Sequence, residues 1–335
     1  MMQRTISASW LRGLYDMFAA EGLDKHELMR ECGLQERDLD NPERRFPTTV
    51  TTRLWELAVA RNNKITLGMD RQLCDRYGGM HLVGYAMMAC PTLMEGLRLM
   101  QRYLAVVSEA TAFEMQKDER GYWIYIGLHG EAKPPRQRAQ FAVLTVLMLC
   151  TWFTRYNIRP LEVEMCYPAP DDTAPFTAAF LTDVTFGQTD NRMLLSHEDL
   201  QRALPTQDPV VASLHERYLQ QQLQKLGHTS TRYRVFTEIV RRLRHGEPRR
   251  ADIAASIHVS ERTLQRRLRE ENISFQELLN DARRELAQEY LSDPRLSLAE
   301  VADLLGFGDQ SNFFRASKRW FGVSPGQYRA RFETA

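Results

Sequence analysis

Residues 251–270 read ADIAASIHVSERTLQRRLRE, and this stretch decides the fold of the C-terminal part of the chain. Apolar residues recur at helical spacing on both sides of His258 and Val259, which predicts a helix over 252–257, a turn and a second helix. Ser260 stands where it can cap the second helix, from Glu261 to Glu270. Four long polar side chains share the outer face of that helix: Arg262, Gln265, Arg266 and Arg269. Such a face suits base edges and phosphates in a DNA major groove.

A second unit of the same kind follows it in the sequence. Ser297 and Glu300 form a capping box ahead of a short helix with an apolar face. A Gly-Phe-Gly turn at 306–308 and a capping Asp309 lead into a second candidate recognition helix over 310–321. Its outward side chains are Ser311, Asn312, Arg315 and Lys318.

The segment between the two units reads as one long helix. Ser274 and Glu277 make another capping box, and apolar residues continue at helical spacing as far as Tyr290. The pair Asp293-Pro294 ends this pattern. A rigid connector has a mechanical purpose, because two readers of B-DNA must lie about 34 Å apart to enter successive major grooves.

The distribution of charge agrees with a DNA-binding C-terminal part. The whole chain has 335 residues and a formal net charge of +1. From residue 231 onward it holds 19 Lys and Arg against 15 Asp and Glu, whereas the first 230 residues hold 25 against 28. The basic excess is mostly arginine, whose planar fork matches phosphates and guanine edges. A solvated helix surface would also be rich in charge, so the charge count by itself fits both interpretations.

Residues 1–204 are predicted to form one α+β domain. Helical spacing of apolar residues at 11–18 and 92–104 alternates with strand-like runs at 122–128, 161–167 and 184–186. The apolar stretch 141–153 is too short to span a bilayer and predicts a buried helix.

Residues 205–231 are predicted to form a linker helix, and residues 232–335 the double helix-turn-helix domain. Pro209 can start the linker helix, which carries a weak apolar stripe of Val211, Leu214 and Tyr218. One short stripe favours packing on the domain's own surface over a dimer helix.

Catalytic chemistry finds little support in the sequence. Residues 322–326, GVSPG, match the G-x-S-x-G elbow of hydrolases, but a helix precedes the serine and Pro325 follows it. The five cysteines are widely spaced and include no C-x-x-C pair, which fits reduced thiols in the cytoplasm better than a zinc site. We therefore expect no catalytic residue, no metal and no cofactor. An N-terminal enzyme tethered to DNA and a nonspecific architectural protein are the rival classes.

The stretch from Ala251 to Phe332 resembles the DNA-binding domain of the AraC/XylS transcription regulators. The matching segments are 259–268 (VSERTLQRRL), 302–307 (ADLLGF), 310–315 (QSNFFR) and 318–325 (KRWFGVSP). Residues 6–205 resemble, more loosely, the sensory domain of the subgroup related to ornithine-utilisation regulators. That resemblance rests on 45–47 (RFP), 84–85 (GY), 92–103 and 160–170.

The resemblance implies roles for single residues. Arg262, Gln265 and Arg266 would read bases in one groove. Ser311, Asn312 and Arg315 would read them in the next. Two positions depart from the family pattern. His258 stands where glycine is frequent, and Ser317 stands where an aromatic residue is common, which predicts looser packing of the second unit.

We therefore predict a cytoplasmic, sequence-specific transcription regulator, an activator that responds to a small-molecule effector bound by its N-terminal sensory domain. The alternative is an effector-independent regulator whose N-terminal domain only dimerises. The predicted partners are double-stranded promoter DNA, RNA polymerase, a small-molecule effector and a second copy of the chain, with no membrane. Aromatic and methionine residues, although such residues more often belong to a core, are the candidates for effector contacts: Tyr85, Met88, Tyr103, Trp123 and Tyr125.

Overall fold

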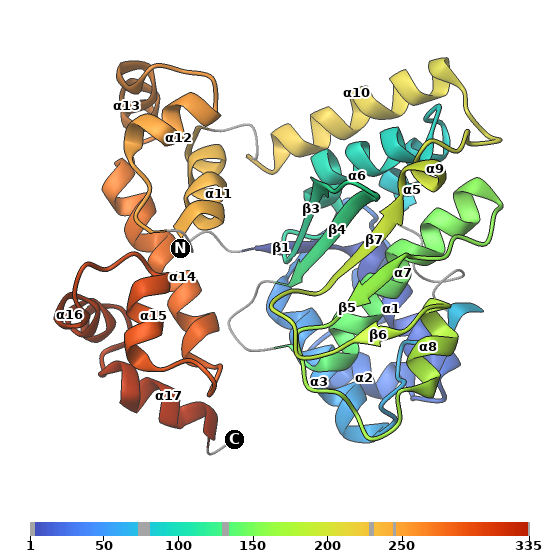
Figure 1. Cartoon of the computed structure of the whole chain (residues 1–335), viewed down its shortest axis with the longest axis horizontal. Coiled ribbons are helices and arrows are strands. Elements are labelled where there is room, and N and C mark those ends of the chain that lie inside the picture. The colour runs from blue at the N-terminus through green and yellow to red at the C-terminus, as the bar shows by residue number, and fades with distance from the viewer. Residues whose placement is uncertain (1–3, 73–80, 129–133, 228–230, 244–245, 334–335) are drawn as a thin grey trace. The chain divides into compact units, whose positions relative to one another are not determined.

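The computed structural model describes residues 4–72, 81–128, 134–227, 231–243 and 246–333 (Figure 1). The chain forms two compact units, one that runs to Leu223 and one that starts at Gln224. The first is α+β and the second is all-helical with two helix-turn-helix units joined by a long helix, as the sequence predicts. Within the described residues, no helix is long and apolar enough to cross a membrane.

The N-terminal unit begins with helices and two very short strands. Its elements as far as residue 107 are β1 (Thr5–Ser7), α1 (Ala8–Ala20), α2 (Lys25–Glu31), the 3-10 helix η1 (Glu36–Leu39), β2 (Arg45–Pro47), α3 (Thr48–Arg61), α5 (His81–Met88) and α6 (Leu93–Val107). Strands β1 and β2 pair antiparallel. Sequence periodicity does not predict them, because three residues are too few to show alternation. Thr92 caps α6 as expected, with its Oγ1 accepting from the Glu95 N–H at 3.3 Å.

A five-stranded sheet forms the second half of this unit. Its strands are β3 (Thr111–Lys117), β4 (Gly121–Leu128), β5 (Glu162–Glu164), β6 (Val184–Thr185) and β7 (Arg192–Ser196). They lie in the order β3-β4-β7-β5-β6, and every pair is antiparallel except β5 with β6. The strand predicted at 122–128 is confirmed as β4, and the two predicted at 161–167 and 184–186 are shorter in the structure.

Helix α7 (Arg136–Thr154) joins the helical half of the unit to the sheet. It packs against β4, and its Phe141 ring contacts the rings of Trp10 on α1 and Trp55 on α3 at centroid distances of 6.2 and 5.4 Å. Most of its residues are buried, which confirms the buried helix predicted for 141–153. The core of this unit therefore lies around α7.

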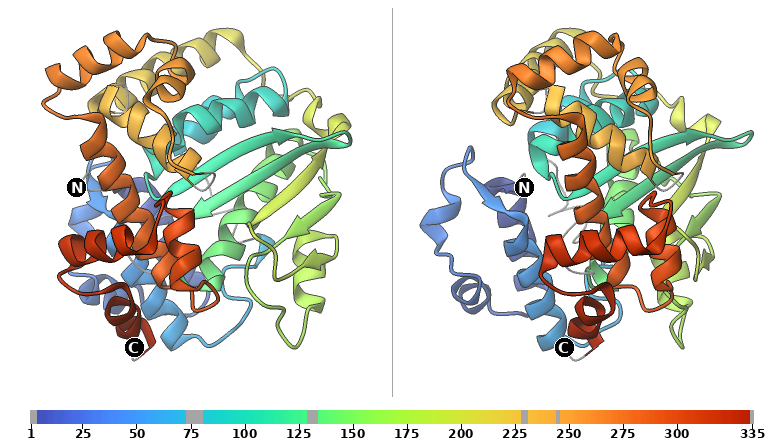
Figure 2. Two further views of the ribbon diagram at one scale, coloured as in Figure 1. Left: turned by 60° about the vertical axis from the view of Figure 1, so that its left-hand side comes forward. Right: turned by 90° about the vertical axis from the view of Figure 1, so that its left-hand side faces the viewer.

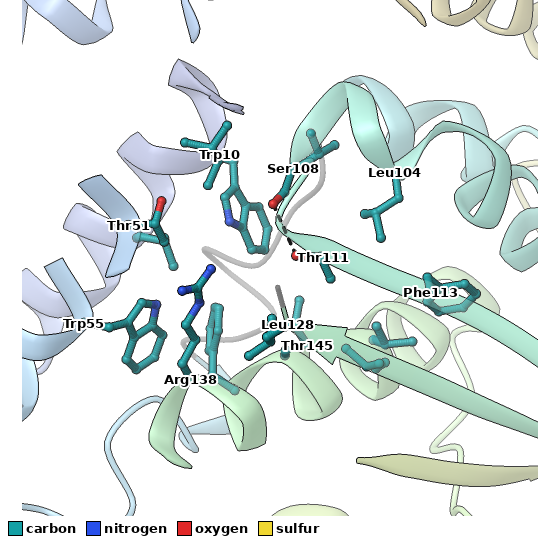
Figure 3. A pocket seen from close by; sticks show the side chains of 17 residues that line it. Trp10, Thr51, Trp55, Leu104, Ser108, Thr111, Phe113, Leu128, Arg138 and Thr145 are labelled. Atoms are coloured by element: carbon teal, nitrogen blue, oxygen red, sulfur yellow. Dashed lines mark hydrogen bonds between the residues drawn. The ribbon is translucent and has the colours of Figure 1, made fainter. Parts of the chain in front are cut away.

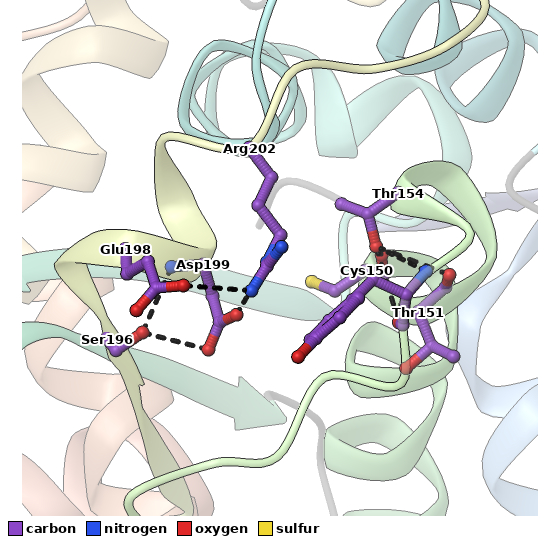
Figure 4. Close-up of polar contacts among 8 residues, drawn as sticks. Cys150, Thr151, Thr154, Ser196, Glu198, Asp199 and Arg202 are labelled. Carbon is purple, nitrogen blue, oxygen red and sulfur yellow. Dashed lines mark hydrogen bonds and ion pairs between the residues drawn. The ribbon is translucent and has the colours of Figure 1, made fainter.

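The chain leaves this unit along a segment that is fastened to it. After α8 (Ala174–Phe180) and β7, Ser196 caps the short helix α9 (His197–Leu200). The Arg202 guanidinium donates to Asp199 at 2.8 Å and lies 3.6 Å from the Tyr156 ring centroid (Figure 4). The Thr206 hydroxyl donates to the Met88 carbonyl at 2.7 Å. The start of the next helix is thereby held against the end of α5.

That next helix, α10 (Pro209–Lys225), packs along the N-terminal unit through Leu219, which is fully buried, and through Glu216, which pairs with Arg102. The apolar stripe of Val211, Leu214 and Tyr218 is exposed instead. The preferred interpretation of this stripe, packing on the domain's own surface, is wrong for Val211 and Leu214, whereas the Tyr218 hydroxyl donates to Glu43 of that unit at 3.3 Å. The reason is that α10 turns a different face, with Leu219, toward the domain.

The C-terminal unit has seven helices in its described residues. They are α11 (Thr231–Leu243), α12 (Arg250–Ser256), α13 (Glu261–Glu270), α14 (Phe275–Leu291), α15 (Leu298–Leu304), α16 (Gln310–Phe321) and α17 (Pro325–Glu333). Helices α13 and α16 have the predicted bounds, and both predicted capping boxes, at Ser274 and Ser297, are present. His258 adopts the left-handed conformation that its turn requires, with φ of 58°.

Ser317, which departs from the family pattern in the second helix-turn-helix unit, takes a buried position in that unit. Its side chain is fully buried in α16, and its hydroxyl donates to the Val323 carbonyl at 3.1 Å. The serine thus ties the helix to the turn that follows it. Three cysteines, Cys32, Cys90 and Cys150, are free thiols, and Cys74 lies outside the described residues.

Candidate nucleic-acid interface and ligand cavity

The first candidate recognition helix, α13, is anchored by its inner face. The Ser260 Oγ accepts from the Thr263 N–H at 3.2 Å, and Leu264 and Leu268 are buried in the core of the unit. The structure brings the four predicted DNA-binding side chains of this helix together on its exposed face: Arg262, Gln265, Arg266 and Arg269. These are nitrogen donors on long stems, which reach base edges and phosphates.

Most of these donors are free to meet a ligand. Arg266 pairs with Glu270 at 2.6 Å, and both side chains are more than half exposed. In the described residues, the side chains of Arg262, Gln265 and Arg269 have no hydrogen bond or ion pair. An exposed i,i+4 pair stabilises a helix by only about 0.3–0.5 kcal/mol. Arg266 can therefore exchange Glu270 for DNA at little cost.

The second candidate recognition helix, α16, is built in the same way. The Asn312 N–H donates to the capping Asp309 Oδ1 at 2.8 Å, while Phe313 and Trp320 are buried. The outer face carries the predicted side chains, all exposed: Ser311, Asn312, Arg315 and Lys318. Arg315 donates to the Asn312 Oδ1 at 2.6 Å, so these two side chains are already oriented relative to each other.

Figure 1 shows α13 and α16 near opposite ends of the C-terminal unit and on the same side of it. Both are seen nearly end-on there, so their axes are roughly parallel, and Figure 2 turns that side toward the viewer. Helix α14 lies between them. This is the arrangement that two major-groove readers on one face of a duplex require.

Arg283 on α14 holds the second unit in place, and the sequence patterns did not single it out. Its buried guanidinium donates to the carbonyls of Leu305 and Gly306 at 2.8 and 2.6 Å and pairs with Glu247 at 2.7 Å. It also lies 4.4 Å from the Phe307 ring centroid. The one available signal was its place at helical spacing among the apolar residues of α14, where an arginine is unexpected.

The N-terminal unit contains a cavity of about 50 Å³ (Figure 3). Its walls come from β1, α1, α3, the end of α6, β3, β4 and α7. Five of the lining residues are polar: Thr51, Ser108, Thr111, Arg138 and Thr145. Within the described part of the chain, no group of three or more His, Cys, Asp or Glu residues could hold a metal ion.

None of the five residues predicted for effector binding lines this cavity. Tyr85 is 57% exposed on α5 and Met88 is partly buried at the end of that helix. Tyr103 is buried on α6 with its hydroxyl 3.3 Å from Glu216. Trp123 and Tyr125 lie together on β4, where the Arg192 guanidinium stacks over the Trp123 ring.

The residues that sequence reasoning missed in this region are Arg138 and Thr51. A signal existed, since Arg138 lies at helical spacing from Phe141 and Thr145 near the start of a mostly apolar helix. Nothing in the sequence placed Thr51, which comes from α3, opposite that face.

Comparisons with known proteins agree with this architecture. Residues 22–204 match the model of the arabinose-binding domain of AraC transcription regulators, and residues 253–331 match a helix-turn-helix domain model. The ornithine utilization regulator of Pseudomonas aeruginosa is 26% identical over 97% of this chain and 96% of its own length. The transcriptional regulator VirS of Mycobacterium tuberculosis is 28% identical over 76% of each chain.

A solved structure of the transcriptional regulator CdpR from Pseudomonas aeruginosa is 21% identical and covers 96% of this chain and 97% of its own, with a TM-score of 0.44. The arabinose-binding model alone spans more than half of the chain, and the helix-turn-helix model covers the two candidate recognition helices, α13 and α16. The chain therefore belongs to the AraC family of transcription regulators, which are DNA-binding proteins and not enzymes.

Proposed function

We propose that this regulator binds promoter DNA in a sequence-specific manner by inserting α13 and α16 into successive major grooves. The observation that carries the proposal is the pair of exposed donor faces on two capped helices within one core. Helix α14 and the Arg283 contacts hold the two helices at a set separation. A rigid separation lets both helices dock at once without a further loss of entropy.

The roles proposed for the single side chains follow from their position and chemistry. Arg262, Gln265 and Arg266 read bases in one groove, and Arg269 reaches the backbone beside it. Ser311, Asn312 and Arg315 read bases in the next groove, and Lys318 meets a phosphate. Phosphate contacts set the register on the duplex, whereas base contacts supply the specificity.

We further propose that the N-terminal unit binds a small-molecule effector and thereby shifts the population of DNA-competent states. Support comes from the cavity and from the names of the matching domain model and of the ornithine utilization regulator. In this proposal the protein acts in the cytoplasm as an activator that contacts RNA polymerase.

The experiment that tests DNA reading is binding of the purified full chain to its own upstream promoter and to scrambled DNA across a salt series. We expect the promoter to bind about 10³-fold tighter or more, the range of specific binders. Equal binding of both DNAs with a steep salt slope would reduce the interaction to phosphate contact.

The alternative function, an N-terminal domain that only dimerises, is favoured by one observation. The outer face of α10 exposes Val210, Val211 and Leu214 to 69%, 38% and 52%. We propose that a second copy of the chain packs on this face of α10, because a two-fold symmetric contact buries the same apolar face of both copies.

Sedimentation equilibrium of the full chain tests this contact. Leu214→Glu is expected to shift the protein toward the monomer, because it buries a charge in the proposed contact. Gln220→Glu, an exposed change on the same helix, is the matched control and leaves the association unchanged. A monomeric wild-type chain, or equal effects of both variants, would rule out α10 as the dimer contact.

A further inference from the structure

A buried arginine without an acidic partner lines the cavity of the N-terminal unit. Arg138 lies in the first turn of α7 and is 5% exposed. Its Nη1 donates to the Thr52 Oγ1 at 3.1 Å, and in the described residues no carboxylate pairs with it. Figure 3 shows its guanidinium extending from α7 toward Trp10 and Thr51.

The position of Arg138 makes its charge doubly unfavourable. Burial alone lowers the pKa of Arg138 to about 10, so the side chain remains a cation at neutral pH. The N-terminal end of a helix carries a positive partial charge, and the first turn of α7 contains no acidic residue to offset it. A buried charge destabilises a fold unless a counter-charge accompanies it. A bound anion would supply that counter-charge.

Two hydroxyl groups in the same cavity also lack a partner. The Oγ1 atoms of Thr51 and Thr145 are buried without a hydrogen bond, and each residue is only 2% exposed. The Thr111 hydroxyl, by contrast, donates to the Ser108 Oγ at 3.2 Å. Buried polar groups without a partner are rare in folded proteins. The cavity therefore offers one guanidinium and two unused hydroxyl donors.

The remaining walls and the size of the cavity limit the ligand further. Apart from five polar residues the described lining is apolar, with Trp10, Trp55, Phe113 and Phe141 as its largest side chains, and no acidic residue is among the described residues that line it. The volume is about 50 Å³, and one water molecule needs about 10–15 Å³ of such space. The space therefore fits a ligand of a few heavy atoms, with one anionic end and an apolar remainder.

We propose that this cavity binds a small organic carboxylate. Its carboxylate group pairs with Arg138 and accepts hydrogen bonds from Thr51 and Thr145, while its apolar part contacts Trp10, Trp55 and Phe141. The inference rests on the proposed function, because it names the chemical class of the effector.

Calorimetric titration and thermal melting of the full-length protein test the proposal. The probes are sodium carboxylates from acetate to hexanoate, with the matching primary amides as neutral controls and ionic strength held constant with NaCl. We expect at least one chain length to bind and raise the melting temperature, and its amide to bind about ten- to a hundredfold more weakly. Equal binding of acid and amide, or no binding in the whole series, would overturn the proposal.

Three variants locate the site. Arg138→Met is expected to remove the preference for acid over amide and to leave the melting temperature of the ligand-free protein equal or higher. Thr145→Val is expected to weaken carboxylate binding about three- to tenfold. Thr151→Val is the matched control, because its hydroxyl is also buried and unpaired on α7 but lies outside the cavity. Equal losses of carboxylate affinity in Thr145→Val and Thr151→Val would contradict the proposed site. This comparison tests the site even if Arg138→Met does not fold.

Promoter binding separates this inference from the proposed function. Carboxylate binding that leaves promoter affinity unchanged would support the site and overturn the effector role. Intact promoter preference without any carboxylate binding would overturn the inference alone. Loss of promoter preference with carboxylate binding retained would overturn only the DNA-reading proposal.

Discussion

At the scale of single residues, the two proposed recognition helices combine side chains that already have a partner with side chains that have none in the described residues. Arg266 is paired with Glu270, and Arg315 with Asn312, so each must exchange or share that partner on DNA. Such local pairs hold long side chains near one rotamer and reduce the entropy that binding must remove.

Arg266→Ala is expected to weaken promoter binding by about 1–3 kcal/mol and to relax specificity at one base pair, because one guanidinium can read one guanine edge. Competition binding against promoter variants, each changed at one base pair, measures both effects. Arg53→Ala removes the same charge from an exposed site on α3 and serves as the control. Equal losses of Arg266→Ala on promoter and random DNA would show a phosphate contact instead.

At the scale of elements, the turn between α15 and α16 depends on close backbone packing. Gly306 has φ of +66°, and a Cβ atom there would lie 2.7 Å from the Glu247 backbone nitrogen. Gly322 ends α16 with φ of +75°, but a Cβ atom there would meet nothing within 4 Å. The two glycines therefore share a left-handed backbone and differ in the space around it.

Gly306→Ala is expected to destabilise the second helix-turn-helix unit more than Gly322→Ala does. Gly322→Ala places a Cβ atom on a left-handed backbone, which costs about 1–2 kcal/mol of folding free energy. Gly306→Ala has the same backbone cost and, in addition, brings the new Cβ atom against the backbone at Glu247, beside the Arg283 contacts. Hydrogen exchange of the α16 amides in the full chain reports the local opening free energy for both variants. Similar amide protection of α16 in the two variants would mean that the backbone at residue 306 shifts to accommodate the Cβ atom at little cost.

At the scale of the whole molecule, the two readers act as one body if α14 and Arg283 keep their separation constant. Rotating one half of the target by half a helical turn should therefore prevent simultaneous docking. Inserting a full helical turn of DNA returns both half-sites to the same face of the duplex. It also moves them about 34 Å further apart, a distance that a rigid connector cannot span.

Insertion of five or of ten base pairs between the two protected halves of the promoter is expected to weaken binding by at least about a hundredfold, because the base contacts of one helix are lost. Gel-shift titration against the unaltered promoter measures this loss. Recovery of affinity with the ten-base-pair insertion would indicate a flexible connection between the readers.

The sequence by itself determined the parts of this protein whose interactions are local. The bounds of α13 and α16, and the capping boxes at Ser274 and Ser297, depend on hydrogen bonds between residues three positions apart. Such bonds form within one helical turn, so the order of residues specifies them directly. The outward position of the hydrogen-bond donors on α13 and α16 follows from the helical periodicity of their buried residues.

Only the tertiary structure decided which distant residues meet. Thr51 on α3 and Arg138 on α7 line one cavity, whereas the five aromatic and methionine candidates do not. Likewise, Arg283 contacts Glu247 and the turn at Gly306, and Leu219 takes the buried position in α10. Packing between elements depends on the shapes and volumes of side chains that are far apart in the chain. No local pattern carries that information, and for this reason the exposed faces of α13 and α16 were predictable whereas the cavity was not.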